Sequence, residues 1–167
     1  MDTIRTSPTA ARTALSVAAV AGVVHGAFSL YWGIGGSWLV DTLGEDLVEQ
    51  WEDNAAVLLP VGSMKILAAL LPLLLLRTPG QPSLWPRLLR AVSWAGAVLL
   101  ILWGGVNTVT GNLVLSGIVE PDGGYDHDGM VGHAWLWDPL FLIWGVALVV
   151  GLLLSGRRVR VDTTLKP

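Results

Sequence analysis

The chain has 167 residues, of which 53% are hydrophobic and only 14% are charged, a composition typical of a membrane protein and not of a soluble domain. It contains no cysteine, which excludes disulfides, thiol catalysis and thiolate metal sites. The net charge of -3 conceals acidic loops that alternate with basic flanks, and this arrangement excludes nucleic acid as a plausible partner.

Four long apolar stretches predict four transmembrane helices, over residues 14–32, 55–76, 88–110 and 134–154. A helix of about 20 residues, rising about 1.5 Å per residue, crosses the roughly 30 Å hydrocarbon layer. We therefore expect an all-α fold, an antiparallel four-transmembrane-helix bundle that forms a single domain over residues 1–167. A cleaved signal peptide is the alternative for the first stretch, but the apolar run continues well past its small-residue site.

Charge is segregated between the segments that flank these helices. Nine of the ten cations lie in the N-terminal segment, the turn after the second helix and the C-terminal tail: Arg5, Arg12, Arg77, Arg87, Arg90, Arg157, Arg158, Arg160 and Lys166. The two remaining loops, residues 33–54 and 111–133, contain acids but no Lys or Arg. By the positive-inside rule, both termini are cytoplasmic and the two acidic loops lie outside the cell membrane.

The first acidic loop is expected to form a short helix on the membrane surface. Apolar residues such as Leu43, Leu47 and Trp51 recur there at helical spacing. The six acids between them would face water: Asp41, Glu45, Asp46, Glu49, Glu52 and Asp53. This surface helix would lie parallel to the bilayer, between the first two crossings.

The second acidic loop combines carboxylates and imidazoles that invite a metal site: Glu120, Asp122, Asp126, His127, Asp128 and His133. Oxygen and imidazole ligands suit Ca²⁺, Mn²⁺ or Zn²⁺. However, their spacing matches no established metal motif, and the calcium-loop pattern is incomplete. We therefore predict neither a metal nor another cofactor.

Lys65 lies near the middle of the second apolar stretch, where a lysine that faced lipid would cost on the order of 3 kcal/mol. Its helical neighbours are mostly small residues, so the ammonium is expected to point into the bundle. It would act as a Schiff-base or general-base lysine, or as a cation that binds a carboxylate or phosphate headgroup. The alternative is a structural lysine, satisfied by backbone carbonyls or by an acid on another helix.

His25 lies about halfway through the first helix, beside a stripe of small residues that favours close helix packing. Ser29 and Trp32 follow one and two turns later on the same face. His25 is either a proton-transfer group or ligand in the same site as Lys65, or a histidine bonded to a neighbouring serine or carbonyl. Beside Lys65 it would be neutral, because adjacent cations repel each other.

Asp138 is the one acid in a clear apolar context, and Pro139 follows it directly. An aspartate before a proline is typical of a helix start, so Asp138 is expected to cap the fourth helix. A role in a binding site, together with Asn107 and His133 near the same depth, is the alternative.

These residues lead to the hypothesis of a site in the outer half of the bundle that binds, and in one version transforms, an amphipathic or isoprenoid-like molecule. Lys65 and His25 would form its floor, and Asp138, with Asn107 and His133, its mouth. Trp32, Trp103 and Trp137 would line it, since aromatic faces can stabilise a cationic group.

If the protein is an enzyme, Lys65, His25 and Asp138 would be its catalytic residues, in an acid–base isomerase or cyclase acting on a lipid-like substrate. The sequence carries no established catalytic motif. Two other classes of function stay open: a non-catalytic accessory subunit that packs against a membrane partner protein, and an oligomeric carrier of protons or ions.

Two short segments carry a resemblance to a known family. The first is the string from Tyr31 to Gly44, which contains Tyr-Trp, Gly-Gly, Trp and Asp-Thr-x-Gly, and the second is Trp137-Asp138-Pro139-Leu140-Phe141. With these segments, and with its hydropathy, the chain resembles a family of small four-helix membrane proteins of unknown function from actinobacteria. The resemblance implies a multi-pass protein of a bacterial cytoplasmic membrane, and it implies no particular reaction or substrate.

Overall fold

The computed structural model describes the backbone of residues 8–77 and 83–164, and the side chains of residues 9–51, 54–77 and 83–156. Its long helices are α1 (Pro8–Gly33), α3 (Leu58–Leu70), α4 (Leu84–Leu115) and α6 (Asp138–Thr164). Short elements extend them: η1 (Val40–Leu43), α2 (Glu45–Glu49), η2 (Glu52–Val57), η3 (Leu71–Leu76), α5 (His127–Gly132) and η4 (His133–Trp137). The described residues contain no strand, so the predicted all-α fold of packed apolar helices is confirmed.

Four helical stretches are long and apolar enough to cross a membrane: Thr9–Gly33, Asn54–Leu76, Leu84–Leu115 and His127–Gly156. Each contains one of the stretches expected from the sequence and extends beyond it. The third begins four residues early because Ser83 caps it, its hydroxyl accepting a hydrogen bond from the Trp85 N–H at 3.3 Å.

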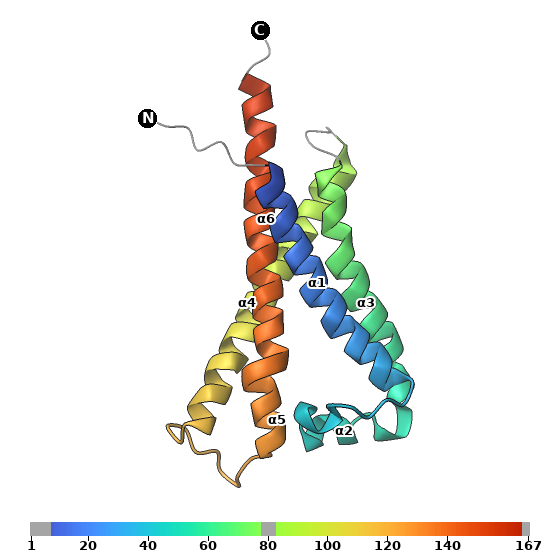
Figure 1. The fold of residues 1–167 in the computed structure, drawn as a ribbon, viewed down its shortest axis with the longest axis vertical. Helices are drawn as coiled ribbons and strands as arrows, with labels where there is room; N and C mark the ends of the chain where they lie inside the picture. Colours follow the sequence, from blue (N-terminus) through green and yellow to red (C-terminus); the bar gives the residue numbers. More distant parts are fainter. Residues whose placement is uncertain (1–7, 78–82, 165–167) are drawn as a thin grey trace.

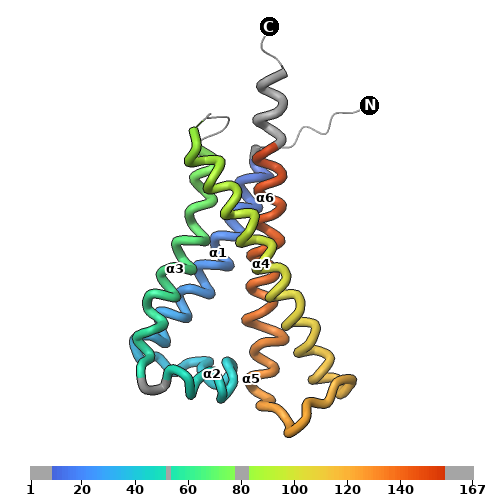
Figure 2. Tube along the Cα trace, turned by 180° about the vertical axis from the view of Figure 1, so that it is seen from behind, coloured from blue at the N-terminus to red at the C-terminus, as the bar shows by residue number. Residues whose placement is uncertain are grey.

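The long helices form a row in the order α3, α1, α6, α4, because the main helix contacts join α1 to α3, α1 to α6 and α6 to α4. Neighbours in this row run antiparallel (Figure 1). The helices converge at one end, where η3 contacts both α1 and α4. At the other end the α1–α3 and α4–α6 pairs diverge, as both views show (Figures 1 and 2).

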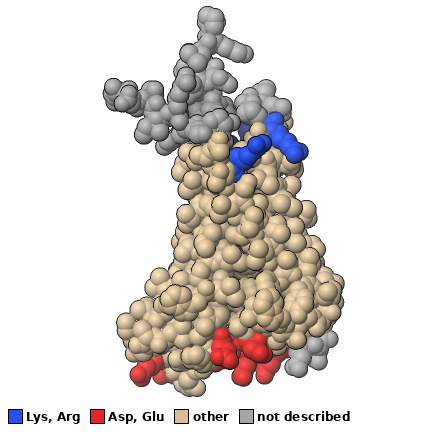
Figure 3. All heavy atoms as spheres, in the orientation of Figure 1, with Lys and Arg blue, Asp and Glu red and all other residues tan. Residues whose placement is uncertain are grey.

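The two ends of the molecule carry opposite charge (Figure 3). Arg77, Arg87 and Arg90 flank the convergent end, which we call the basic end, and the loops rich in Asp and Glu cover the divergent end, which we call the acidic end. The side chains of five cations lie outside the described part: Arg5, Arg157, Arg158, Arg160 and Lys166.

Small residues allow α1 to approach both of its neighbours. A Cβ added at Gly22 would lie 2.6 Å from the Trp144 ring of α6 and 2.6 Å from the Ala69 Cβ of α3. A Cβ at Gly26 would lie 2.9 Å from the Gly62 carbonyl oxygen of α3. The predicted stripe of small residues therefore lies where α1 meets α3 and α6, which brings polar side chains of α1 and α3 within reach of each other beside α6.

The expected single surface helix is divided into η1, α2 and η2 at the acidic end. Gly44 separates the first two, with a φ of 91° that L residues rarely adopt. Asn54, at φ -150° and ψ 61°, interrupts η2. The side chains of Glu52 and Asp53 lie outside the described part.

Candidate functional site

Lys65 of α3 joins three helices through its ammonium group. Its Nζ lies 3.0 Å from the Ser29 Oγ and 3.2 Å from the His25 Nδ1, both on α1, and 5.6 Å from the centre of the Phe141 ring on α6. His25 and Ser29 are only 5% and 2% exposed, whereas Lys65 is half-buried. We call Lys65, His25 and Ser29 the lysine cluster.

The contact with Lys65 fixes the hydrogen-bonding role of His25. An ammonium has no lone pair, so the His25 Nδ1 must accept, and the proton of the neutral ring then resides on Nε2. Within the described part of the chain, that buried Nε2 has no hydrogen-bond partner. Both His25 and Lys65 therefore keep donor capacity that other described residues do not use.

Aromatic rings surround the lysine cluster on the α6 side and towards the acidic end. The His25 ring lies 3.9 Å from the Phe141 ring and 5.7 Å from the Trp137 ring, measured between centroids. Trp137 continues this layer to Phe28 and Trp32, each with a centroid distance of 5.1 Å. On these two sides the lysine cluster therefore lies against π faces, which tolerate a cation.

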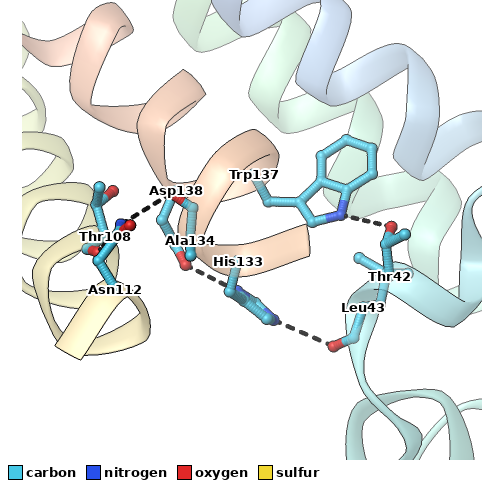
Figure 4. A network of polar contacts seen from close by, with 8 residues as sticks. All are labelled: Thr42, Leu43, Thr108, Asn112, His133, Ala134, Trp137 and Asp138. Atoms are coloured by element: carbon cyan, nitrogen blue, oxygen red, sulfur yellow. Dashed lines mark hydrogen bonds and ion pairs between the residues drawn. The ribbon is translucent and has the colours of Figure 1, made fainter. Parts of the chain in front are cut away.

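A second polar group is built around His133, on the π-helical turn η4 (Figure 4). The His133 Nδ1 lies 2.8 Å from the Asp138 Oδ2, and its Nε2 lies 3.1 Å from the Leu43 carbonyl oxygen. Since a carbonyl can only accept, Nε2 carries a proton, and a further proton is shared along the line from Nδ1 to Oδ2. The pair is therefore either imidazolium with carboxylate or imidazole with carboxylic acid, and in both states its net charge is zero.

The same turn holds the first acidic loop against α6 (Figure 4). The Trp137 Nε1 donates to the Thr42 Oγ1 at 3.0 Å, next to the bond between His133 and Leu43. Gly132 makes this approach possible, since a Cβ there would overlap the Thr42 carbonyl and lie 2.6 Å from the Thr42 Cβ. The two sequence segments that carried the family resemblance meet at this junction.

The expectation that Asp138 caps the start of the fourth helix is wrong, because α5 and η4 lead without a break into α6 and Asp138 itself has helical φ and ψ of -77° and -38°. This continuous helical stretch begins at His127, and Asp126 is its cap, with Oδ1 accepting from the Asp128 N–H at 3.0 Å. The other carboxylate oxygen of Asp126 accepts from the Glu45 N–H at 3.2 Å and so links the two acidic loops. The wider turn η4 absorbs Pro139, whose ring lacks an N–H, and leaves Asp138 facing His133 inside a continuous helix.

A cleft of about 890 Å³ opens at the acidic end, between α4, the first acidic loop and the second acidic loop. From α4 it is lined by Trp103 and Asn107, and from the η4 side by His133 and Asp138. The described residues contain no group of three His, Cys, Asp or Glu side chains placed to hold a metal ion.

The eight predicted site residues lie in two places. Lys65, His25, Trp32 and Trp137 belong to the lysine cluster and its aromatic layer, and Trp103, Asn107, His133 and Asp138 line the cleft. Sequence reasoning did not identify Phe141, Thr42 or Gly132. Phe141 and Thr42 lie inside the family-like segments, which was the available signal, whereas nothing local marked Gly132.

Comparison with known proteins places this architecture in a family. The profile of DUF3995, described as a protein of unknown function, matches residues 22–148, which is well over half of the chain and includes both the lysine cluster and the His133 group. No curated protein and no solved structure matches the chain significantly. This membrane-type, four-helix chain therefore belongs to the DUF3995 family of proteins of unknown function.

Proposed function

We propose that the protein binds an amphipathic, isoprenoid-like molecule with an anionic headgroup inside the membrane, and that Lys65 neutralises that headgroup. The observation that carries the proposal is the set of Lys65 partners. Its ammonium contacts a neutral imidazole nitrogen, a hydroxyl and an aromatic ring. Within the described residues, no carboxylate lies at ion-pair distance from it.

The energetics favour an anion at this place. A lysine near the bilayer centre costs on the order of 3 kcal/mol. Hydrogen bonds to two neutral acceptors offset only about 0.6 kcal/mol of this cost each, on average, in membranes. A phosphate or carboxylate would offset more of this cost, because it adds the attraction between opposite charges in a low-dielectric environment to the hydrogen bond itself. The ammonium of Lys65 has three N–H groups and two acceptors among the described residues, so one N–H is left to donate to the anion.

The surroundings favour an apolar tail on the same molecule. Beyond the lysine cluster, α3 presents mostly exposed apolar side chains, such as Met64 at 65% and Leu67 at 59%. The bilayer that covers this face is the source from which an amphipathic molecule can reach Lys65. We place the basic end in the cytoplasm and the acidic end outside a bacterial cytoplasmic membrane, in accordance with the positive-inside rule.

The test is native mass spectrometry of the protein purified in a mild non-ionic detergent, followed by extraction of any bound small molecule. We expect wild-type protein to retain an acidic amphiphile and Lys65→Met to lose at least nine-tenths of it. Arg87→Gln, which removes an exposed cation at the basic end, is the matched control and should retain the ligand. Equal retention by Lys65→Met and wild type would refute the proposal.

An accessory subunit, or an oligomer, is the second candidate. It is favoured by the low burial of α3 and α4, each with only 17% of its apolar window buried, against 44% in the first span. In this case a partner protein, or a second copy of the chain, would cover α3 and α4. The same spectra separate the candidates, since this one predicts a co-purified protein or a multiple of the chain mass.

A further inference from the structure

The cleft at the acidic end has the size and depth of a binding site of its own. Its volume of about 890 Å³ is within the usual range for small-molecule sites, about 300–1,000 Å³. Trp103, Asn107 and Gly111 line it at intervals of four residues, so the cleft follows one face of α4 for about 12 Å. It therefore extends from the acidic loops into the depth at which α4 is apolar.

Two aromatic side chains are left exposed in this cleft. Trp103, at its deep end, is 64% exposed, and Tyr125, on the second acidic loop, is 44% exposed. Both contribute large π faces to a concave surface, where an apolar or cationic group can cover them. Neither ring belongs to the aromatic layer around the lysine cluster.

The residues at the rim of the cleft indicate the sign of the charge expected on its ligand. Glu45, Asp46 and Asp126 line it, and the described lining residues include no Lys or Arg. His133 and Asp138 on the wall are neutral as a pair, so they do not offset these carboxylates. The cleft thus combines net negative charge at its mouth with an exposed indole at its base.

We infer that the cleft binds an organic ammonium ion with apolar substituents, whose charge faces Glu45 and Asp46 and whose alkyl groups cover Trp103. A bare divalent cation fits less well, because no three acidic or histidine side chains in the described part converge and the aromatic faces would stay uncovered. The ligand of this site is opposite in charge to the one proposed for Lys65.

Choline and its neutral isostere 3,3-dimethylbutan-1-ol test the inference, because they differ mainly in charge. Binding to the full-length protein in lipid nanodiscs is followed by calorimetric titration. We expect choline to bind at least tenfold more tightly than the alcohol. Trp103→Leu and the double variant Glu45→Gln/Asp46→Asn should each weaken choline binding at least fivefold, which corresponds to about 1 kcal/mol.

Matched controls separate this site from general effects and from the proposed function. Trp85→Leu removes an indole of similar exposure at the basic end, and Glu49→Gln removes an acid outside the cleft lining. Both should bind choline as wild type does, and so should Lys65→Met. Equal affinity for choline and the alcohol, no choline binding, or equal loss in the controls would overturn the inference, whatever the outcome for the Lys65 ligand.

Discussion

Gly132 is the position where a single methyl group should release the first acidic loop from the helices. A Cβ there would overlap the Thr42 carbonyl, which is backbone and cannot rotate away. Gly132→Ala should therefore push residues 40–44 off the η4 turn. The bonds from His133 to the Leu43 carbonyl and from Trp137 to the Thr42 hydroxyl would break together.

The expected loss of stability follows from three contributions. Overpacking of a filled contact costs about 1–3 kcal/mol, and the two broken hydrogen bonds cost about 1 kcal/mol each. Alanine is favoured over glycine within a helix by about 1 kcal/mol, which offsets part of the loss. We therefore expect Gly132→Ala to lower the free energy of unfolding by about 2–4 kcal/mol.

Thermal unfolding in detergent, followed by tryptophan fluorescence, measures this change. A chain of this length shifts by about 2–4 °C per kcal/mol, so the midpoint should fall by several degrees. Gly96→Ala is the matched control, because a Cβ at Gly96 in α4 would meet no atom within 4 Å. Its midpoint should stay level or rise. If Gly132→Ala unfolds at the wild-type temperature, the close docking of the loop on η4 is refuted.

Two further predictions concern the His133 group. Trp137→Phe removes the hydrogen bond to the Thr42 hydroxyl and should cost about 1 kcal/mol in denaturant unfolding. Thr42→Val removes that bond and also the one that the same hydroxyl donates to the Leu39 carbonyl at 2.6 Å, so it should cost about 2 kcal/mol, and the double variant should cost no more than Thr42→Val alone. His133→Leu leaves the carboxylate of Asp138, which is 1% exposed, without its partner, and should destabilise by about 3–5 kcal/mol. Adding Asp138→Leu should recover part of that loss in the same assay, and a further loss would contradict the pairing. His127→Leu, at a 70% exposed side chain, is the control and should unfold as wild type.

The sequence was sufficient to predict the helices because their signal is local. Apolar runs of about 20 residues and the segregation of arginines from acids require no knowledge of tertiary contacts. The direction of Lys65 could be predicted for the same reason, since the small residues one turn away mark the face on which α3 meets another helix. His25 and Ser29 share a helical face one turn apart, and both contact the amine.

The acidic end could not be predicted in the same way, because its contacts join residues about 90 positions apart. His133 meets Leu43, and Trp137 meets Thr42, through a π-helical turn that no local pattern indicates. The Asp138-Pro139 pair led to the wrong prediction of a helix cap for a related reason. Capping rules are local, and Asp126, 12 residues earlier, is the residue that caps the helix. Trp103 was expected to line one site with Trp32 and Trp137, whereas in the structure it lines the cleft at the acidic end.

The central claim is that the Lys65 ammonium binds an anionic headgroup within the membrane, and lysine labelling tests it directly. The chain has two lysines, Lys65 and Lys166, so ¹⁵N-labelled lysine gives two side-chain signals in solid-state NMR, and Lys65→Met assigns them. In protein held in its native membrane lipids, we predict that the Lys65 nitrogen shows a through-space contact to the ³¹P or carboxyl ¹³C of a molecule other than the protein. A Lys65 signal in contact only with His25 and Ser29 would contradict the account.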